Sequence, residues 1–257
     1  MALRDRHTAC PCLHGITSIA ATALPGQTSI AESYVIPFTV SGVNSMYQVY
    51  AFSTPNSVKV PIALEELGLQ YELHSVNVRK GEQKHADFVA LNPNGKVPVL
   101  RDDEHGFTLS ESAAILVYLA ERHGALLPQE PLTRARTFEQ LFVHASGLSP
   151  AFGQAGYFLR SAPSGSSEHA LDRFAQEARR QLGLLDAVLS VRAFVAGNDF
   201  SIADIAHFGW IWRRTFPDLT LDDTPNVQRW YDAVSNRPAV GRAIARIESL
   251  AEDRKAA

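Results

Sequence analysis

A serine at the start of a predicted helix is the first place where this chain could bind a charged ligand. Glu111 and Ser112 come directly before a run of apolar residues at helical spacing, residues 113–119. A helix start offers the serine hydroxyl, free backbone N–H groups and the positive end of the helix dipole, which together favour a carboxylate. The glutamate could pair with an ammonium group, so the two residues could hold an α-amino acid head group. Taken alone, the pair could also be a serine cap that only begins a helix.

A proline at the start of a predicted strand offers a second point of contact. Val97 and Pro98 open a short apolar run. Proline is tolerated at the first residue of a strand and is often cis in a tight turn. In that conformation the backbone of Val97 would face outward and could pair with a peptide ligand.

These residues lie in a pattern of strands and helices. Residues 47–52 and 71–78 read as strands, and the helix between them implies a right-handed crossover and a parallel pair. A short helix near residues 86–91 and an antiparallel hairpin around the turn at 101–106 complete a thioredoxin-like α/β domain. Pro61 falls about five residues inside the first helix, where a proline removes a hydrogen bond, so we expect an irregular first turn.

The second half of the chain shows helical patterns throughout. A linker at residues 125–132 separates a predicted domain at 46–124 from one at 133–257. The predicted helices are residues 133–158, 167–189, 202–216, 225–236 and 238–251. Ser201 and Asp204 match a capping box that begins the third of these helices. We therefore expect an all-α helical-bundle domain.

The first 45 residues lack a sustained apolar period. We expect residues 1–45 to be a disordered or non-native extension with Met46 as the true start, and a secretory signal is the alternative. Cys10 and Cys12 are the two cysteines of the chain. A metal site there would need two more ligands and only two histidines lie nearby, so we expect no metal. Chemistry from residue 46 onward then cannot use a protein thiolate.

Composition narrows the class of protein. The chain has 257 residues, of which 46% are hydrophobic and 20% are charged, which is ordinary for a globular protein of one or two domains. A net charge of -3 without a basic run argues against a nucleic-acid partner. No run of about 18 apolar residues is present, which argues against a membrane partner.

In this order and spacing, the Val97-Pro98 turn, the Glu111-Ser112 pair and the Ser201–Asp204 capping box resemble the glutathione transferase superfamily. The resemblance covers the chain from Tyr47 to about Ala251. It implies that the proline turn binds the cysteinyl backbone of glutathione and that the Glu-Ser pair binds the γ-glutamyl end. It also implies a homodimer and a cytoplasmic location.

The loop after the first strand is where this fold activates the glutathione sulfur. The loop has neither the tyrosine nor the cysteine that several classes use. Thr54-Pro55-Asn56 is instead similar to the bacterial nu class, in which the Thr and Asn of this motif contact the sulfur. The alternative is that Thr54 and Asn56 only cap a helix. The candidates for the sulfur ligand are Ser53, Thr54, Asn56 and Ser57, and Ser53 is the main rival of Thr54.

Three further residues are assigned by the same resemblance. Gln83 matches a glutamine that contacts glutathione, Lys96 lies where related classes place a cation near the glycyl carboxylate, and Arg173 matches an arginine of the helical domain. Each could simply be a surface residue. An apolar substrate pocket between the domains could be lined by aromatic residues, which could equally be core: Phe152, Tyr157, Phe158, Phe208 and Trp212.

The resemblance implies a glutathione-dependent transferase or a disulfide-bond reductase that uses bound glutathione as co-substrate and no protein cysteine. The resemblance also allows peroxidase activity, aromatic-ether cleavage and a role in detoxification. The second substrate would be a small electrophile or a disulfide. The rival interpretation is a non-catalytic binding or regulatory protein that keeps the fold.

Overall fold

The computed structural model describes residues 47–163, 165 and 168–252. The expectations about residues 1–45, the start at Met46 and the two cysteines lie outside these residues. Within the described part of the chain, no helix is both long and apolar enough to cross a bilayer.

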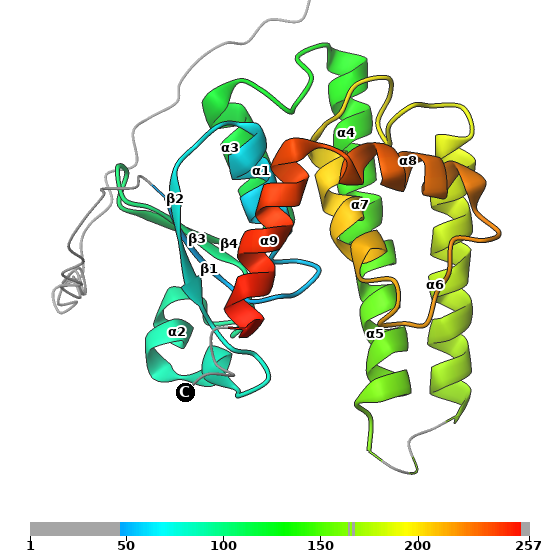
Figure 1. The fold of residues 1–257 in the computed structure, drawn as a ribbon, viewed down its shortest axis with the longest axis horizontal. Coiled ribbons are helices and arrows are strands. Elements are labelled where there is room, and N and C mark those ends of the chain that lie inside the picture. Colours follow the sequence, from blue (N-terminus) through cyan, green and yellow to red (C-terminus); the bar gives the residue numbers. More distant parts are fainter. Residues whose placement is uncertain (1–46, 164, 166–167, 253–257) are drawn as a thin grey trace, which may run out of the picture. The chain divides into compact units, whose positions relative to one another are not determined.

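A four-stranded sheet organises the N-terminal half, with strand order β2-β1-β3-β4 (Figure 1). The strands are β1 (Tyr47–Ala51), β2 (Tyr71–Ser75), β3 (Val99–Asp102) and β4 (Phe107–Ser110). β1 and β2 are parallel, whereas β3 runs antiparallel to both β1 and β4. The predicted crossover, the hairpin and the thioredoxin-like arrangement are therefore confirmed.

Side chains alternate between the two faces of this sheet, as the pleat requires. Val49 and Leu100 are opposite one another and belong to the main core, together with residues of the helices on that face. Val99 faces the other way and packs with Phe88. The helices of this half are α1 (Lys59–Glu66), the 3₁₀ turn η1 (Glu82–Lys84), α2 (Ala86–Leu91) and α3 (Ser112–His123).

The position of Pro61 differs from the prediction. α1 begins at Lys59, so Pro61 is the third residue of the helix and not about the fifth. A backbone N–H in the first turn has no intrahelical acceptor, so a proline there removes no helical hydrogen bond.

The C-terminal half is helical, as predicted. Its elements are α4 (Pro131–Val143), the π-helical turn η2 (His144–Leu148), α5 (Ser149–Arg160), α6 (Glu168–Leu189), α7 (Ile202–Trp212), α8 (Pro225–Ser235) and α9 (Pro238–Glu252). α4 begins inside the expected linker, because Glu130 accepts hydrogen bonds from the backbone N–H groups of Leu132 and Thr133. The single helix expected at 133–158 is interrupted by η2. The helix expected at 202–216 ends at Trp212, and the residues that follow form turns.

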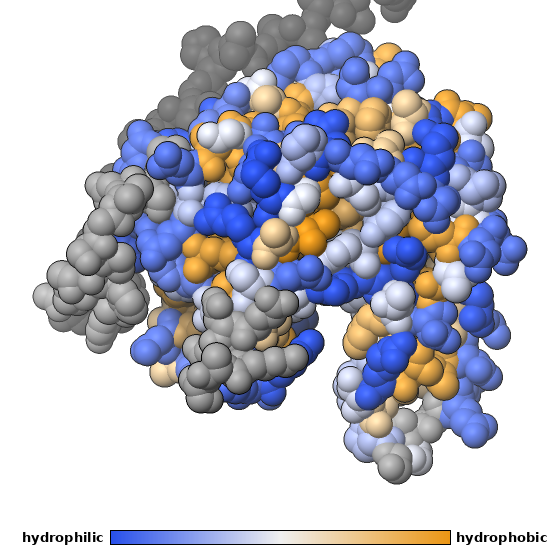
Figure 2. Space-filling model, in the orientation of Figure 1, coloured by the Kyte–Doolittle hydropathy of each residue, from blue (hydrophilic) through white to orange (hydrophobic). Residues whose placement is uncertain are grey.

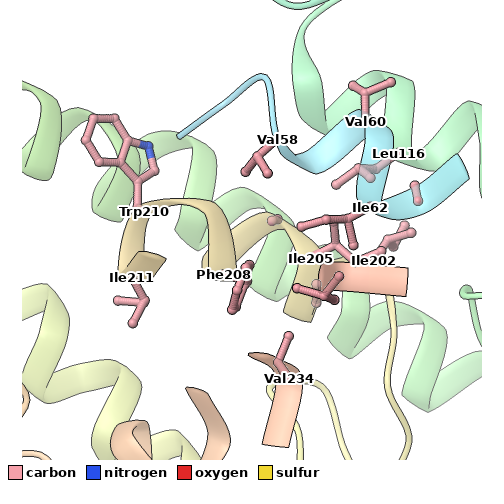
Figure 3. Close-up of a cluster of buried hydrophobic side chains, with 14 of the residues drawn as sticks. Val58, Val60, Ile62, Leu116, Ile202, Ile205, Phe208, Trp210, Ile211 and Val234 are labelled. Carbon is pink, nitrogen blue, oxygen red and sulfur yellow. The ribbon is translucent and has the colours of Figure 1, made fainter. Parts of the chain in front are cut away.

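The two halves share one apolar core. α1 packs against α7 and α9, and α3 packs against α7. Figure 3 shows this contact, with Val58, Ile62 and Leu116 facing Ile202 and Ile205. Gly209 permits a close approach at this interface, because a Cβ built there would lie 2.0 Å from the backbone oxygen of Pro55. The packing of α7 thus fixes the loop between β1 and α1.

Candidate functional site

A cavity of about 430 Å³ lies between the loops of the sheet and the start of α5. Its lining residues are Asn56, Asn92, Lys96, Val97, Pro98, Glu111, Ser112, Ser149, Pro150, Gly153, Gln154 and Trp210. Six of them are residues that the sequence assigned to a ligand site: Asn56, Lys96, Val97, Pro98, Glu111 and Ser112. In the space-filling view, the surface is hollowed between the α2 region and the lower ends of α5 and α6 (Figure 2).

The proline turn forms one wall of the cavity. The Val97–Pro98 peptide bond is cis, as expected. Asn92 is buried below the turn and donates a hydrogen bond from Nδ2 to the Lys96 carbonyl oxygen at 2.7 Å. The same side chain accepts from the Asn94 backbone N–H through Oδ1, at 3.1 Å. Asn92 was not singled out from the sequence, although it lies shortly before the turn that it supports.

Glu111 and Ser112 form the opposite end of the site. The prediction that a serine caps α3 is wrong, because Glu111 is the N-cap residue and Ser112 is the first residue of the helix. Glu111 has φ 68°, a conformation that non-glycine residues adopt at a cost of about 1–3 kcal/mol and most often at functional sites. Its carboxylate is solvent-exposed, while the Ser112 hydroxyl is half-buried.

The loop after β1 is internally bonded. Thr54 Oγ1 accepts a hydrogen bond from the Ser57 backbone N–H at 3.1 Å, and the hydroxyls of Thr54 and Ser57 are 2.8 Å apart. Thr54 is half-buried and is not among the lining residues of the cavity, whereas Asn56 is. Ser53 accepts a hydrogen bond from Arg213 Nη2 at 2.7 Å. Of the four sulfur-ligand candidates, Ser53, Thr54, Asn56 and Ser57, Asn56 is thus the one on the cavity wall.

A buried cationic cluster lies directly behind Asn56. Lys59 has no exposed surface, and its Nζ donates to Asn56 Oδ1 and contacts His144 Nε2, both at 2.7 Å. Burial lowers the pKa of Lys59 to about 7. Burial, followed by the charge of Lys59, holds the pKa of His144 well below its usual value, and burial lowers that of His207 to about 4. Lys59 and the two histidines were not singled out from the sequence.

Two of the more distant residues lie away from the cavity lining. Gln83 is half-buried in η1, and its Oε1 has no partner among the described residues. Arg173 is exposed on α6, where its charge acts on Glu177. Lys96 is exposed at the edge of the cavity.

Four of the five aromatic residues predicted to line a pocket fall into two groups. Phe152 and Phe208 have no exposed surface; Phe152 packs on Trp210 and Phe208 stacks on Tyr231, so both belong to the core. Tyr157 is exposed and contacts the edge of Phe158, which stacks on Phe174.

The tryptophan on the cavity wall is not the predicted one. Trp212 lies under the guanidinium group of Arg213, which is 3.7 Å from its ring centroid. Trp210 lines the cavity instead, and its Nε1 donates to Ser149 Oγ at 2.8 Å. Two residues correspond to about 200° around a helix, so the two rings face nearly opposite sides of α7.

A group of potential metal ligands lies outside this cavity. Asp102, Glu104 and His105 have ligand atoms within 4.8 Å of one another. Asp102 already accepts a hydrogen bond from the Tyr118 hydroxyl at 2.5 Å. These residues belong to the β3–β4 hairpin, and none of them lines the cavity.

Comparison with known proteins finds two matching family models. Residues 54–122 match the glutathione S-transferase N-terminal domain, and residues 148–238 match the C-terminal domain. The disulfide-bond oxidoreductase YfcG of Escherichia coli (strain K12) is 35% identical over 210 residues, which are 79% of this chain and 96% of that protein. Its relative YghU from the same organism is 38% identical over 211 residues, which are 76% of this chain and 73% of that protein.

Two solved structures are similar in fold and sequence. A glutathione transferase from Burkholderia graminis with two glutathione molecules bound per subunit has 38% identity and a TM-score of 0.73, over 78% of this chain and 88% of that one. A glutathione transferase from Pseudomonas putida with one glutathione disulfide bound per subunit has 37% identity and a TM-score of 0.73, over 78% of this chain and 91% of that one.

Proposed function

Because the chain belongs to the glutathione S-transferase family, we propose that it uses bound glutathione thiolate to reduce disulfide bonds, without a protein cysteine. One observation carries the proposal: the cis-proline turn, the Glu111-Ser112 pair and Asn56 line the same cavity, and no cysteine is among the described residues that line it. The oxidoreductase names of two relatives and the glutathione disulfide in the Pseudomonas putida structure support a disulfide as the second substrate.

The reaction takes two glutathione molecules. The thiolate of the first attacks one sulfur of the substrate disulfide, forming a mixed disulfide and releasing the other half as a thiolate, which takes up a proton. The thiolate of the second then attacks the glutathione sulfur of the mixed disulfide. Glutathione disulfide forms and the second half of the substrate leaves as a thiol. Two electrons pass from two glutathione thiols to the substrate, so the chain needs no redox group of its own.

Each part of the cavity takes one part of the first glutathione. The Val97 backbone pairs with the cysteinyl unit beside Pro98. Ser112 and the backbone N–H groups at the start of α3 hold the γ-glutamyl carboxylate, and Glu111 pairs with its ammonium group. Lys96 lies near the glycyl carboxylate. We propose that Gln83 and Arg173 lie at the outer edge of the site and contact the second glutathione.

The sulfur lies against the loop after β1. Asn56 donates from its amide, and Thr54 is the second donor. In the present geometry the Thr54 and Ser57 hydroxyls share one hydrogen bond. A hydroxyl hydrogen rotates to suit its partners, so Ser57 can donate in that bond and leave the Thr54 hydroxyl to donate to sulfur. A thiolate stabilised in this way is the nucleophile that disulfide exchange requires.

The proposal is tested by assaying the purified protein with glutathione and three second substrates: a small symmetrical disulfide, an aryl halide and an organic hydroperoxide. We expect the disulfide to be reduced with the highest kcat/KM. A higher value for the aryl halide or the hydroperoxide would assign transferase or peroxidase chemistry to the same thiolate. Failure to bind glutathione in calorimetry would support the non-catalytic alternative. The activity suits the cytoplasm, where the glutathione pool keeps thiols reduced.

We also propose a homodimer, formed through an apolar groove between α3 and α4. The groove has a volume of about 420 Å³ and is lined by Ala113, Ala114, Val117, Tyr118, Glu121, Phe138, Leu141, Phe142 and Ala145. Phe142 is 69% exposed. Large apolar side chains that cluster at a surface usually mark an interface, so this exposure supports a contact between subunits. A second copy of the chain is the occupant that the family resemblance implies.

Sedimentation tests the dimer directly. We expect a single species at about twice 28.2 kDa for the wild type, and a shift toward the monomer for Phe142→Asp, because a carboxylate in the groove would be buried without a partner. Val191→Asp is the matched control, since Val191 is 78% exposed and lies outside the groove. A wild-type species near 28.2 kDa at micromolar concentration would contradict the proposal.

A further inference from the structure

Lys59 is a buried cation without a carboxylate partner among the described residues. Its ammonium nitrogen is close to three groups: Asn56 Oδ1 and His144 Nε2 at 2.7 Å, and Ser112 Oγ at 3.4 Å. Two of the three, Asn56 and Ser112, are on the wall of the cavity. A buried charge of this kind is costly unless its environment or a ligand compensates it.

The chemistry of an ammonium group fixes the orientation of its neighbours. It has three N–H donors and no acceptor, so Asn56 must present its carbonyl oxygen to Lys59 and its NH₂ group elsewhere. The imidazole of His144 must likewise accept through Nε2, which makes it a neutral ring with its proton on Nδ1. The His144 Nδ1 atom has no hydrogen-bond partner among the described residues. When Lys59 is protonated, the cluster therefore holds one positive charge, on Lys59.

We propose that Lys59 is a positioning residue for the glutathione sulfur: its ammonium group holds the Asn56 amide with the N–H groups toward the sulfur and provides a buried positive charge that the thiolate compensates. This inference rests on the proposed function, in which Asn56 contacts the sulfur. Lys59 does not touch the ligand itself, because it has no exposed surface and is not among the cavity-lining residues.

The charged groups around Lys59 make its protonation sensitive to an anion in the cavity. His144 from η2 and His207 from α7 are neutral at physiological pH because burial lowers the pKa of both. Glu111, which precedes α3, is the acidic group that favours the ammonium form, and it is exposed. Since burial lowers the pKa of Lys59 to about 7, part of the Lys59 population is neutral at and above that pH. A thiolate in the cavity favours the ammonium form, so thiolate binding and protonation of Lys59 are coupled.

Loss of the proton would also release Asn56. A neutral lysine amine can accept a hydrogen bond, so the Asn56 amide can then rotate and turn its oxygen toward the sulfur. An oxygen in that position repels a thiolate. Thiolate stabilisation by Asn56 is therefore expected to require the ammonium form of Lys59.

Lys59→Met tests this inference, because methionine keeps an unbranched side chain of similar length but has no charge and no donor. The pKa of the bound thiol, followed by thiolate absorbance at saturating glutathione, is expected to rise by about one unit. The kcat near pH 7 should fall by up to about tenfold, with a smaller change in KM. Lys80→Met is the matched control, since Lys80 is exposed and outside the site, and it should leave both quantities unchanged.

The outcomes separate this inference from the proposed function. If the wild type does not bind or activate glutathione, the proposed function fails. If the wild type is active and Lys59→Met keeps the wild-type thiol pKa, the inference fails and the function stands. A double variant with Asn56→Ala should show a smaller shift than the sum of the single shifts, because Lys59 acts partly through Asn56.

A measurement on the wild type keeps the inference testable even if the variant does not fold. At pH 8, glutathione binding releases the thiol proton, but Lys59 takes one up, so calorimetry in buffers of different ionisation enthalpy should give a net release near zero. With S-methylglutathione, which forms no thiolate, neither proton should move. A net release equal to the thiolate fraction found by absorbance would show that Lys59 takes up no proton, and would overturn the coupling between thiolate binding and protonation of Lys59.

Discussion

Asn56→Ala is expected to slow glutathione-dependent disulfide reduction by roughly tenfold to a hundredfold, because it removes the amide donor that lines the cavity. The pKa of the bound thiol should rise by about one to two units, and each unit corresponds to about 1.4 kcal/mol of lost thiolate stabilisation. Thiolate absorbance and turnover as functions of pH, both at saturating glutathione, measure the two effects. The loss should be largest below the thiol pKa of the variant and should shrink above it.

Two further variants separate an effect on the thiol pKa from an effect on glutathione binding. Asn56→Asp keeps the shape of the side chain but places a carboxylate beside Lys59, so it should raise the thiol pKa further by repelling the thiolate. Ser112→Ala should mainly raise KM, by about 1–3 kcal/mol of lost binding, since Ser112 holds the γ-glutamyl group in ground and transition states alike.

Alanine variants of Thr54 and Ser53 are compared by the pKa of the bound thiol, as for Asn56. Thr54→Ala is expected to raise the thiol pKa, whereas Ser53→Ala is not, since Arg213 already contacts the Ser53 hydroxyl. If Thr54→Ala and Asn56→Ala both keep the wild-type thiol pKa and rate while Ser53→Ala loses them, the sulfur is activated by serine and the nu-like assignment of the loop is wrong.

The parts of the fold that could be predicted are those with a strong local pattern. The strand around Val49 alternates between buried and half-buried residues, Leu100 lies in a short apolar run, and Ser201 with Asp204 forms the predicted capping box. Element ends were less predictable. α4 begins early because Glu130 accepts from two backbone N–H groups, although glutamate is not a preferred cap. The π-helical turn at His144–Leu148 has no pattern that distinguishes it from the α-helices on either side.

The cavity was predictable where consecutive residues form a wall, and unpredictable where distant elements meet. Val97 and Pro98 lie together in sequence, as do Glu111 and Ser112. Contact between Lys59 and His144 instead depends on tertiary packing across 85 positions. A lysine in an apolar helical run usually extends to the surface, so its burial has no local sign. One signal was present: Lys59 follows Asn56 by three residues at the start of a helix, where side chains at that spacing can meet.

The second large effect is expected at Asp204, which supports the helical domain. Its side chain has no exposed surface and accepts four hydrogen bonds. Oδ1 accepts from the Val195 backbone N–H and from Trp230 Nε1, both at 2.8 Å. Oδ2 accepts from the Ser201 backbone N–H at 2.9 Å and from the Ser201 hydroxyl at 3.2 Å. One carboxylate thus joins the start of α7 to α8 and to the segment before α7.

Asp204→Ala is expected to lower the free energy of unfolding by about 3–5 kcal/mol, because it leaves several buried donors without an acceptor. Urea unfolding measures the loss. Asp204→Asn should cost less, since the amide keeps one oxygen for two of the four donors. Asp199→Ala is the control, because Asp199 is exposed and should change stability by no more than about 0.5 kcal/mol.

α7 carries Trp210 and presses Gly209 against the loop that holds Asn56, so Asp204→Ala should also weaken glutathione binding at temperatures where the protein is still folded. A loss below about 1 kcal/mol would mean that water or rearranged backbone replaces the carboxylate, and that the capping box contributes little to holding α7 in place.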